Sequence, residues 1–344
     1  MSISKIIYDG VRVKIEVDEA RGIITEILNN CGCELEHAEL IADHLVDSNL
    51  CGVESHGAMR ILQYVDQFRS GYMKPESGPC VSREDEIFLI IDGQAGHGIP
   101  AMDLAYKSAA KVARTKHICV TSIINVGHTG RHGSFADHCA EDGFLSILIG
   151  GGNREVWRQV APYGGCEPKL PTNPYCIGFP GDERGPLVLD FATSMIAGGW
   201  IYAAQNAGGY LPENCIIDRN GMASVTPADY FDGGSILPAA GQKGYGLALA
   251  AELISEALIG PVQTEGNWLL LMINTSAMTP LDGLRKRASV IFDDIISCKP
   301  APGFEKVEIP GQRERRLRHE AGGIIDLPEN TWNEIVALRN SLVI

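Results

Sequence analysis

The sequence predicts an α/β protein that carries a helical substructure at its N-terminal end. Two amphipathic helical patterns, at 22–30 and 34–49, come before the first long apolar strand. Later in the chain, short apolar runs and helical patterns alternate, as they do in an α/β core. We therefore predict a helical part over residues 1–75 that packs with the C-terminal segment 300–344, and an α/β core over residues 76–299.

Composition narrows the classes of function. The formal net charge of −14 argues against nucleic acid and anionic membrane surfaces as partners, because both require basic patches. The ten cysteines include no CxxC pair and the first residues do not resemble a secretory signal, so we expect a cytoplasmic protein. The most apolar helical run, 247–259, contains Glu252 and Glu256 and is too short to span a membrane.

The elements are predicted in order from apolar periodicity and from the Gly- and Pro-rich turns between them. A Gly/Pro/Lys linker over 71–79 separates the helical part from the first long strand. The predicted strands are 5–16, 86–92, 117–126, 144–149, 175–179, 187–191 and 269–273, and the helices after the first two are 57–70, 100–113, one ending near 141, 247–259, 281–295 and 327–338.

The stretch Ser55-His56-Gly57-Ala58-Met59-Arg60 is the first candidate site. If 57–69 is a helix, Ser55 caps its start, and His56 and Arg60 lie on one face of its first turn. Histidine offers a proton near neutral pH, and arginine offers a planar fork that fits a carboxylate. Alternatively, Ser55 is only a cap, His56 a helix-end residue and Arg60 a solvated charge.

Two glycine-rich loops are candidates for phosphate binding. Gly96-His97-Gly98-Ile99-Pro100-Ala101 formally matches GxGxxA. We reject it as a dinucleotide loop because the run 111–128 contains no acid for the ribose, and we place Pro100 at the first helical position. The second loop, 127–135, has glycines at close spacing before a helix start and carries Arg131, which favours a phosphate.

A zinc site is the competing interpretation of the second loop. His128 and His132 have the spacing of one helical face, but the glutamate of HExxH is missing, and Gly130 and Gly133 indicate a loop. Asp190 stands at a strand end before small hydroxyl residues, where it could orient a catalytic His or Ser or cap the next helix.

These pieces form a series that resembles the malate/L-lactate dehydrogenase family of the type-2 kind, over about residues 18–340. That family includes sulfolactate, ureidoglycolate and 2,3-diketogulonate dehydrogenases and a cyclic-imine reductase. No single motif is specific, but the series is. The motifs are Ser55-His56-Gly57 with Arg60, Gly127-His128-Thr129-Gly130, Thr172-Asn173-Pro174, Leu189-Asp190-Phe191-Ala192-Thr193-Ser194, Lys243-Gly244-Tyr245-Gly246 and Pro310-Gly311.

The resemblance implies a homodimer that binds NAD(P) on a mixed α/β sheet without a Rossmann fold. It implies that His56 is the proton donor in reduction and the base in oxidation, and that Ser55 and Asp190 orient it. Arg60 would hold the carboxylate of a small 2-hydroxy or 2-keto acid, and Thr172 would also contact the substrate. The implied cofactor-binding residues are His128, Gly130, Arg131, His132, Pro180, Gly181, Asp182, Gly311, Gln312 and Arg313, and no metal is implied.

Several alternatives stay open at this stage. Family members commonly have Gly-Lys where this chain has Gly199-Trp200, and Gly-Thr-Asn-Pro where it has Pro171-Thr172-Asn173-Pro174, which bears on the substrate. Reduction of a cyclic imine carboxylate, a metal-dependent hydrolase and a non-catalytic binder are the competing functions. Asp182 near the ribose would favour NAD, whereas arginines at 313–316 could receive the 2′-phosphate of NADP.

Overall fold

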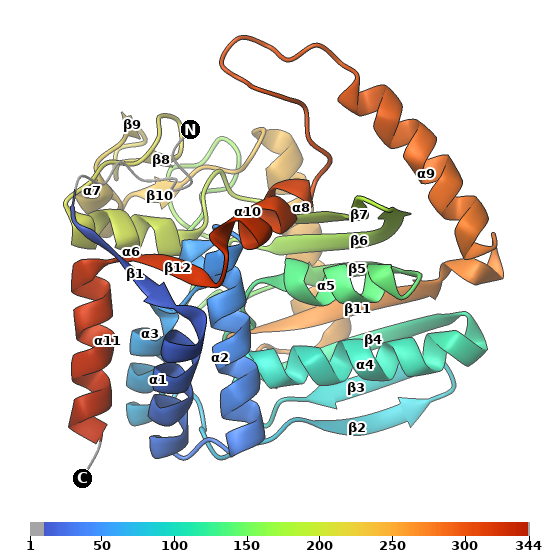
Figure 1. The fold of residues 1–344 in the computed structure, drawn as a ribbon. Coiled ribbons are helices and arrows are strands. Elements are labelled where there is room, and N and C mark those ends of the chain that lie inside the picture. The colour runs from blue at the N-terminus through green and yellow to red at the C-terminus, as the bar shows by residue number, and fades with distance from the viewer. Residues whose placement is uncertain (1–9, 343–344) are drawn as a thin grey trace.

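The computed structural model describes residues 10–342 and is built on a seven-stranded mixed sheet (Figure 1). In this sheet β3 and β4 are parallel, and every other neighbouring pair is antiparallel. The predicted mixed α/β architecture is therefore confirmed. The strands in spatial order are β2 (Cys80–Asp85), β3 (Phe88–Asp92), β4 (Ile118–Val126), β11 (Gly266–Asn274), β5 (Phe144–Gly150), β6 (Pro174–Asp182) and β7 (Gly185–Ala192).

Helices cover both faces of this sheet. Helices α4 (Gly98–Lys116) and α5 (His132–Glu141) lie on the face turned to the viewer in Figure 1, and α8 (Gln242–Glu252) lies behind it, continued by a π-helical segment, η2 (Leu253–Ile259). Helix α4 begins at Gly98 after the cap residue His97, so the placement of Pro100 at the first helical position was wrong.

The N-terminal helices form a separate layer closed by the C-terminal end of the chain. Strand β1 (Arg12–Glu16) pairs antiparallel with β12 (Ile324–Pro328), and α11 packs against α1 and α3. The predicted helix 327–338 therefore begins only after Pro328, because the preceding residues complete this ribbon. Part of the predicted strand 5–16 lies outside the described residues. The helices of this layer are α1 (Val17–Asn30), α2 (Leu35–Leu50), α3 (Arg60–Arg69) and α11 (Glu329–Leu342), with the turn η1 (Glu54–His56) before α3.

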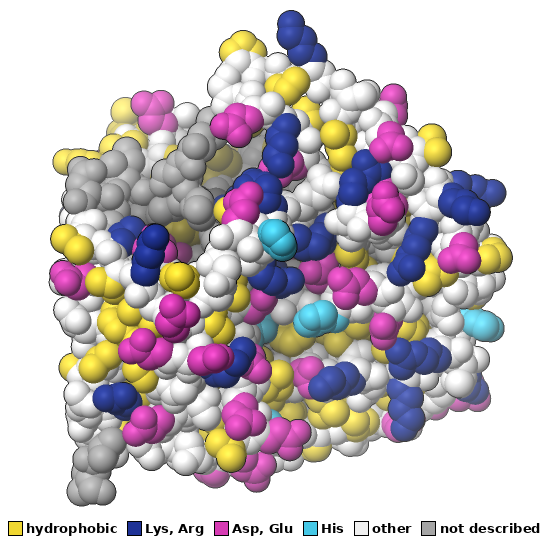
Figure 2. Space-filling view, in the orientation of Figure 1, with side chains coloured by type: hydrophobic (Ala, Val, Ile, Leu, Met, Phe, Trp, Pro, Cys, Tyr) yellow, Lys and Arg dark blue, Asp and Glu magenta, His cyan; other side chains and the backbone are white. Residues whose placement is uncertain are grey.

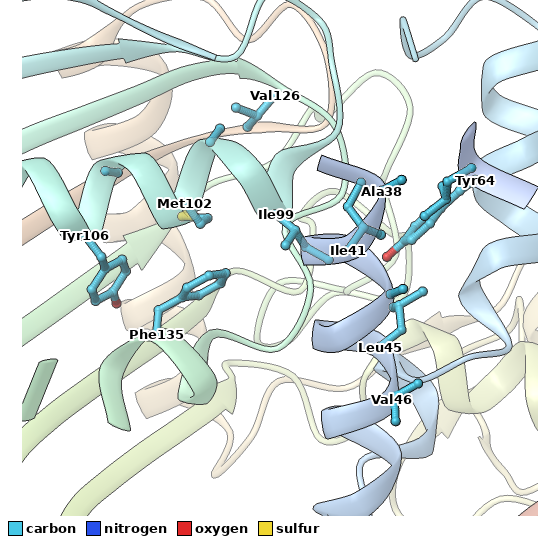
Figure 3. Close-up of a cluster of buried hydrophobic side chains, with 14 of the residues drawn as sticks. Ala38, Ile41, Leu45, Val46, Tyr64, Ile99, Met102, Tyr106, Val126 and Phe135 are labelled. Carbon is cyan, nitrogen blue, oxygen red and sulfur yellow. The ribbon is translucent and has the colours of Figure 1, made fainter. Parts of the chain in front are cut away.

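One apolar core joins the helical layer to the sheet. In Figure 3, Ile41 and Leu45 of α2 face Ile99 and Met102 of α4, and Tyr64 of α3 lies at the edge of the same cluster. All five side chains are fully buried. Because close-packed interiors resist deformation, this core fixes α3, and the turn before it, relative to the sheet.

A smaller unit with its own core sits beside the main sheet, and the sequence patterns did not predict it. Val160, Trp200, Ile216 and Ile236 are among its buried residues. Its strands have two residues each, too short for an apolar alternation to be recognised. The elements not yet named are β8 (Ile216–Ile217), β9 (Ala223–Ser224), β10 (Ser235–Ile236), α6 (Gly198–Ala207), α7 (Pro227–Phe231), η3 (Thr275–Ala277), α9 (Leu281–Ile296) and α10 (Gln312–Ala321).

The surface gives two further observations. Lys and Arg side chains are interspersed with Asp and Glu over the face shown in Figure 2. Within residues 10–342, no helix combines the length and the apolar character needed to cross a membrane.

Candidate active site

The turn that carries His56 differs from the helix start that the sequence predicted. Ser55 and His56 lie in the 3₁₀ turn η1, and α3 begins only at Arg60. Gly57 is extended and interrupts the helix, and Asn49 Oδ1 accepts a hydrogen bond from the Ala58 backbone at 2.7 Å. Ser55 does not cap α3, whose N-terminus has no side-chain cap among the described residues, and its Oγ instead lies 3.1 Å from His56 Nδ1.

His56 lies against the ring of a second histidine. Its imidazole stacks on that of His128 with 5.5 Å between the ring centroids, and His128 Nδ1 lies 2.7 Å from the hydroxyl of Tyr64. Burial, followed by the positive charge of Arg60, holds the pKa of His56 well below its ordinary value. The lowered pKa keeps the imidazole of His56 in its neutral form at pH 7.

Arg60 is held firmly but has no acidic partner. Its Nε donates to the Ser55 carbonyl at 2.6 Å and its Nη1 to Gln63 Oε1 at 2.5 Å. It forms no ion pair with any residue between 10 and 342. A Cβ at Gly199 would collide with Nη2, so only glycine lets the backbone of α6 approach the guanidinium this closely. Burial lowers the pKa of Arg60, which is the sign of a poorly compensated charge.

A cavity of about 630 Å³ opens beside the His56 turn. This volume lies in the usual range for small-molecule and cofactor sites. Elements far apart in the chain build its walls, including η1, the start of α5, the end of β7 and the start of α10. The predicted site residues on its walls are Ser55, His56, Gly130, Arg131, His132, Thr172, Asp190, Gly311 and Arg313.

The other predicted site residues do not line this cavity. Asp182 is bound by its neighbour Arg184, with 2.8 Å between Oδ2 and Nε, and Gln312 Oε1 accepts from the Ile309 backbone at 2.8 Å. Gly181 is packed against the backbone of Gly185. The residues that do not reach the walls are Arg60, His128, Pro180, Gly181, Asp182 and Gln312.

Asp190 lies on the cavity wall with Ser55 and His56, but its carboxylate binds a backbone N–H group and not the imidazole. Its Oδ2 accepts a hydrogen bond from the Gly133 backbone at 2.6 Å, at the start of α5. No hydrogen bond to His56 is formed within the described part of the chain. The structure thus brings together the Ser55–His56 half of the predicted relay and leaves Asp190 as a helix-capping acid.

Three arginines on the wall, Arg131, Arg315 and Arg318, form what we call the arginine rim. Each contacts a carboxylate: Asp47 lies 2.7 Å from both Arg131 and Arg318, and Asp137 lies 2.7 Å from Arg315. Although burial opposes it, Arg131 and Arg318 hold the pKa of Asp47 below its ordinary value. The sequence analysis missed Arg318 and both acids, which come from helices α2, α5 and α10 and share no local motif.

The arginine rim and the glycines beside it fit a dinucleotide. The Nε atoms of Arg131 and Arg315 are buried without a hydrogen-bond partner among the described residues. Gly130 has φ +74°, and a Cβ there would lie 2.3 Å from His44 Nε2. The loop therefore requires glycine at this position of the cavity wall. Helices α5 and α10 both begin at the cavity, and helix N-termini attract phosphate.

The histidines considered for zinc have other partners. His132 Nε2 lies 2.8 Å from Thr129 Oγ1, and His128 contacts Tyr64 and His56. Over residues 10–342, no group of three or more His, Cys, Asp or Glu side chains is arranged to hold a metal ion.

Comparison with known proteins identifies the class. A family model for malate/L-lactate dehydrogenases matches residues 15–336, and the chain belongs to this family. Relatives named as hydroxy-acid dehydrogenases support an oxidoreductase that acts on CH–OH groups, as the sequence analysis predicted.

Individual relatives match over nearly the whole chain. An L-sulfolactate dehydrogenase from Methanocaldococcus jannaschii is 30% identical over 341 residues, covering 95% of this chain and 97% of the relative. A malate dehydrogenase from Pyrococcus abyssi is 31% identical over 324 residues, covering 88% and 87%. The solved structure of malate dehydrogenase from Pyrococcus horikoshii superposes with a TM-score of 0.88 at 26% identity, covering 99% of both chains.

Proposed function

We propose that this protein is an NAD(P)-dependent dehydrogenase that interconverts a small 2-hydroxy acid and the corresponding 2-keto acid. The observation that carries the proposal is the pairing of a neutral, Ser55-oriented His56 on the cavity wall with Arg60, a guanidinium that lacks a carboxylate partner. A proton-transfer group beside a free carboxylate-binding group is what this reaction requires from the protein.

In the proposed mechanism the protein handles one proton and one carboxylate. Bound nicotinamide supplies or accepts the hydride. In oxidation, neutral His56 accepts the proton of the substrate hydroxyl as the carbonyl forms, and Ser55 Oγ holds the imidazole through Nδ1. In reduction, protonated His56 returns that proton to the carbonyl oxygen. A carboxylate held by Arg60 offsets the charge that lowers the pKa of His56, so we infer that substrate binding favours this protonation.

The substrate carboxylate would reach Arg60 through the segment that precedes and begins α6. Ala197 and Trp200 line the cavity, whereas the guanidinium lies against Gly199. We therefore infer that either this segment or the side chain of Arg60 shifts when an acid binds. Thr172, on the same cavity wall, remains our candidate for a second substrate contact.

We propose that the cavity holds the dinucleotide outside a Rossmann fold, which the largely antiparallel sheet supports. The expectation of NAD rested on Asp182, which is bound to Arg184 away from the cavity wall and gives no support to this choice. Arg313 lines the wall and could receive a 2′-phosphate. NAD stays our first cofactor, and NADP is its direct competitor.

We also propose a cytoplasmic homodimer. Exposed apolar side chains on α8 and η2 support association, because large apolar residues rarely gather on the surface of a monomer. They are Leu247, Leu249, Leu253 and Leu258. Light scattering after gel filtration would test the dimer.

The test of the reaction is oxidation of NADH and NADPH with a panel of 2-keto acids and one cyclic imine carboxylate. Turnover of any keto acid is the expected result and identifies the cofactor in the same assay. Turnover of the imine alone would favour the alternative reductase. Failure of both nicotinamides to bind would refute the proposal.

A further inference from the structure

Glu265 is an acid that the proposed reaction does not use. It directly precedes β11, and its backbone donates to the Val126 carbonyl at 3.1 Å, where β4 ends. The Asn153 backbone donates to the Glu265 carbonyl at 3.0 Å. Since His128 follows Val126 by two residues, Glu265 is fixed at the edge of the sheet that carries the histidine pair.

A hydrogen-bonded pair of aromatic side chains, Tyr72 and Trp157, orients the carboxylate of Glu265. The Tyr72 hydroxyl donates to Oε2 at 3.1 Å, and Trp157 Nε1 donates to the Tyr72 oxygen at 3.1 Å. Trp157 also acts as a hydrogen-bond donor on this carboxylate, and Glu265 forms no ion pair within residues 10–342. Because each carboxylate oxygen can accept more than one hydrogen bond, acceptor capacity remains for a ligand.

Glu265 and Arg60 influence each other without touching. Burial raises the pKa of Glu265 to about 7, against the hydrogen bond from Tyr72 and the charge of Arg60. In turn, the charge of Glu265 counteracts the burial of Arg60. Tyr64 acts on the pKa of Arg60 in the same direction as Glu265. Any ligand bound at Arg60 therefore lies in the field of Glu265.

We propose that Glu265 determines which acids this site accepts. The site selects monocarboxylates whose distal group is uncharged or donates a hydrogen bond, and it rejects acids with a second anionic group. The inference rests on the proposed function, because it assumes that Arg60 holds the substrate carboxylate.

The selection follows from the charges on the two residues. A monoanion at Arg60 leaves one positive and two negative charges, whereas a dianion adds a third negative charge in a partly desolvated site. Like charges at close range in such an environment discriminate strongly between ligands. A hydroxyl or amide on the substrate can instead donate a hydrogen bond to the Glu265 carboxylate.

The test compares kcat/KM for pyruvate, hydroxypyruvate and oxaloacetate in the wild type, Glu265→Gln and Glu155→Gln. Glutamine keeps the shape of Glu265 and removes its charge, and Glu155 is an exposed acid near the Asn153 contact that serves as the matched control. We expect Glu265→Gln to raise the oxaloacetate-to-pyruvate ratio by about tenfold or more. The control should keep the wild-type ratio.

The pH dependence supplies an independent readout. Below about pH 7 Glu265 takes up a proton, so the wild-type oxaloacetate-to-pyruvate ratio should rise as the pH falls. In Glu265→Gln this change should disappear. Tyr72→Phe removes a hydrogen bond that lowers the pKa of Glu265 and should move the transition to higher pH.

Binding of two pyruvate analogues separates this inference from the proposed reaction. Oxamate has an amide where oxalate has a second carboxylate, and calorimetry with reduced nicotinamide measures both without turnover. Preference for oxamate that is lost in Glu265→Gln supports the inference even if no keto acid on the panel is reduced. Equal binding of the two analogues, or an unchanged oxaloacetate-to-pyruvate ratio in Glu265→Gln, overturns it even if the enzyme is active.

Discussion

The arginines on the two sides of the His56 turn differ in one respect, the presence of an acid. In the arginine rim, Arg131, Arg315 and Arg318 each have a carboxylate oxygen within 2.7 Å. Arg60 has a carbonyl and an amide oxygen as partners and no ion pair within the described chain. The different partners of the two groups imply different roles.

The difference distinguishes scaffold from binding group. The charge of a buried guanidinium is compensated when a carboxylate pairs with it, and removing either partner leaves an uncompensated charge. Without a carboxylate, the charge of a buried guanidinium stays uncompensated until an anion binds. On this reasoning, the arginine rim mainly joins α2, α5 and α10 around the cavity, whereas Arg60 keeps its charge available for the substrate.

The largest expected effect concerns the turn beside Arg60. His56→Ala should lower turnover by about 10²–10⁴-fold, the usual contribution of a general acid or base. Nicotinamide binding, measured by fluorescence titration, should survive because the cavity walls formed by α5, β7 and α10 are unchanged. Turnover close to wild type in this variant would remove His56 from the proton-transfer role.

In the arginine rim, Arg131→Met should lower the unfolding free energy. It leaves Asp47 with Arg318 as its remaining cation and breaks a buried ion pair, which typically costs about 3–5 kcal/mol of unfolding free energy. Urea unfolding followed by circular dichroism measures the change. A loss below about 1 kcal/mol would mean that the pair is not part of the scaffold.

Arg60→Met should show the opposite pattern. Binding of substrate acids should weaken by about 30-fold or more, because the partner of the carboxylate is lost. The unfolding free energy should stay unchanged or rise, since a poorly compensated buried charge is replaced by an apolar group. Equal KM values in the variant and the wild type would end the carboxylate role, and a large loss of stability would contradict the comparison itself.

Buried neutral histidines predict a pH dependence of stability. Burial lowers the pKa of His44, which binds the Arg131 backbone, and of His97 to about 3. The unfolded chain therefore takes up protons first, below its pKa near 6.5. Unfolding free energy should fall as the pH drops below about 6.5, by up to about 1.4 kcal/mol per pH unit for each such histidine. The raised pKa of Glu265 has the opposite effect on the unfolding free energy. Between the ordinary pKa of a glutamate and about pH 7, the folded state binds the extra proton, so this contribution to stability grows as the pH falls.

His97→Asn is the matched test of this prediction. Asparagine can cap α4 as the His97 ring does through Ile99, but it does not titrate. Urea titrations at several pH values should show a slope smaller by about one proton. An unchanged slope would show that His97 titrates normally in the folded protein.

The sequence predicted those parts of the molecule that short local patterns encode. Strands β3, β4, β5 and β11 were expected from continuous apolar runs, and the Ser55–His56 pair from its motif. Strand β2 was missed because it is an exposed edge strand with polar residues, and β12 because its pairing partner lies more than 300 residues away.

The missed site residues have a common cause. Glu265 was missed because its proposed role depends on its interactions with Tyr72 and Arg60. Asp47 was missed because its role depends on its ion pairs with Arg131 and Arg318. No spacing along the chain encodes these contacts, because they form only when distant elements pack. Asp182 shows the converse, since a neighbour two residues away, Arg184, occupies a carboxylate that the motif assigned to the cofactor.

The ribbon of β1 and β12 has a consequence for the order of assembly during synthesis. Arg12 of β1 donates to Asp326 of β12 at 2.7 Å and to Glu54, the residue before Ser55, at 3.2 Å. The ribosome releases residues 54–56 long before residue 326, so nascent chains can pack the helices while this brace is still missing. The contact of Arg12 with both Asp326 and Glu54 therefore forms only after β12 emerges, so the turn that carries the proposed proton-transfer residue is completed late in synthesis.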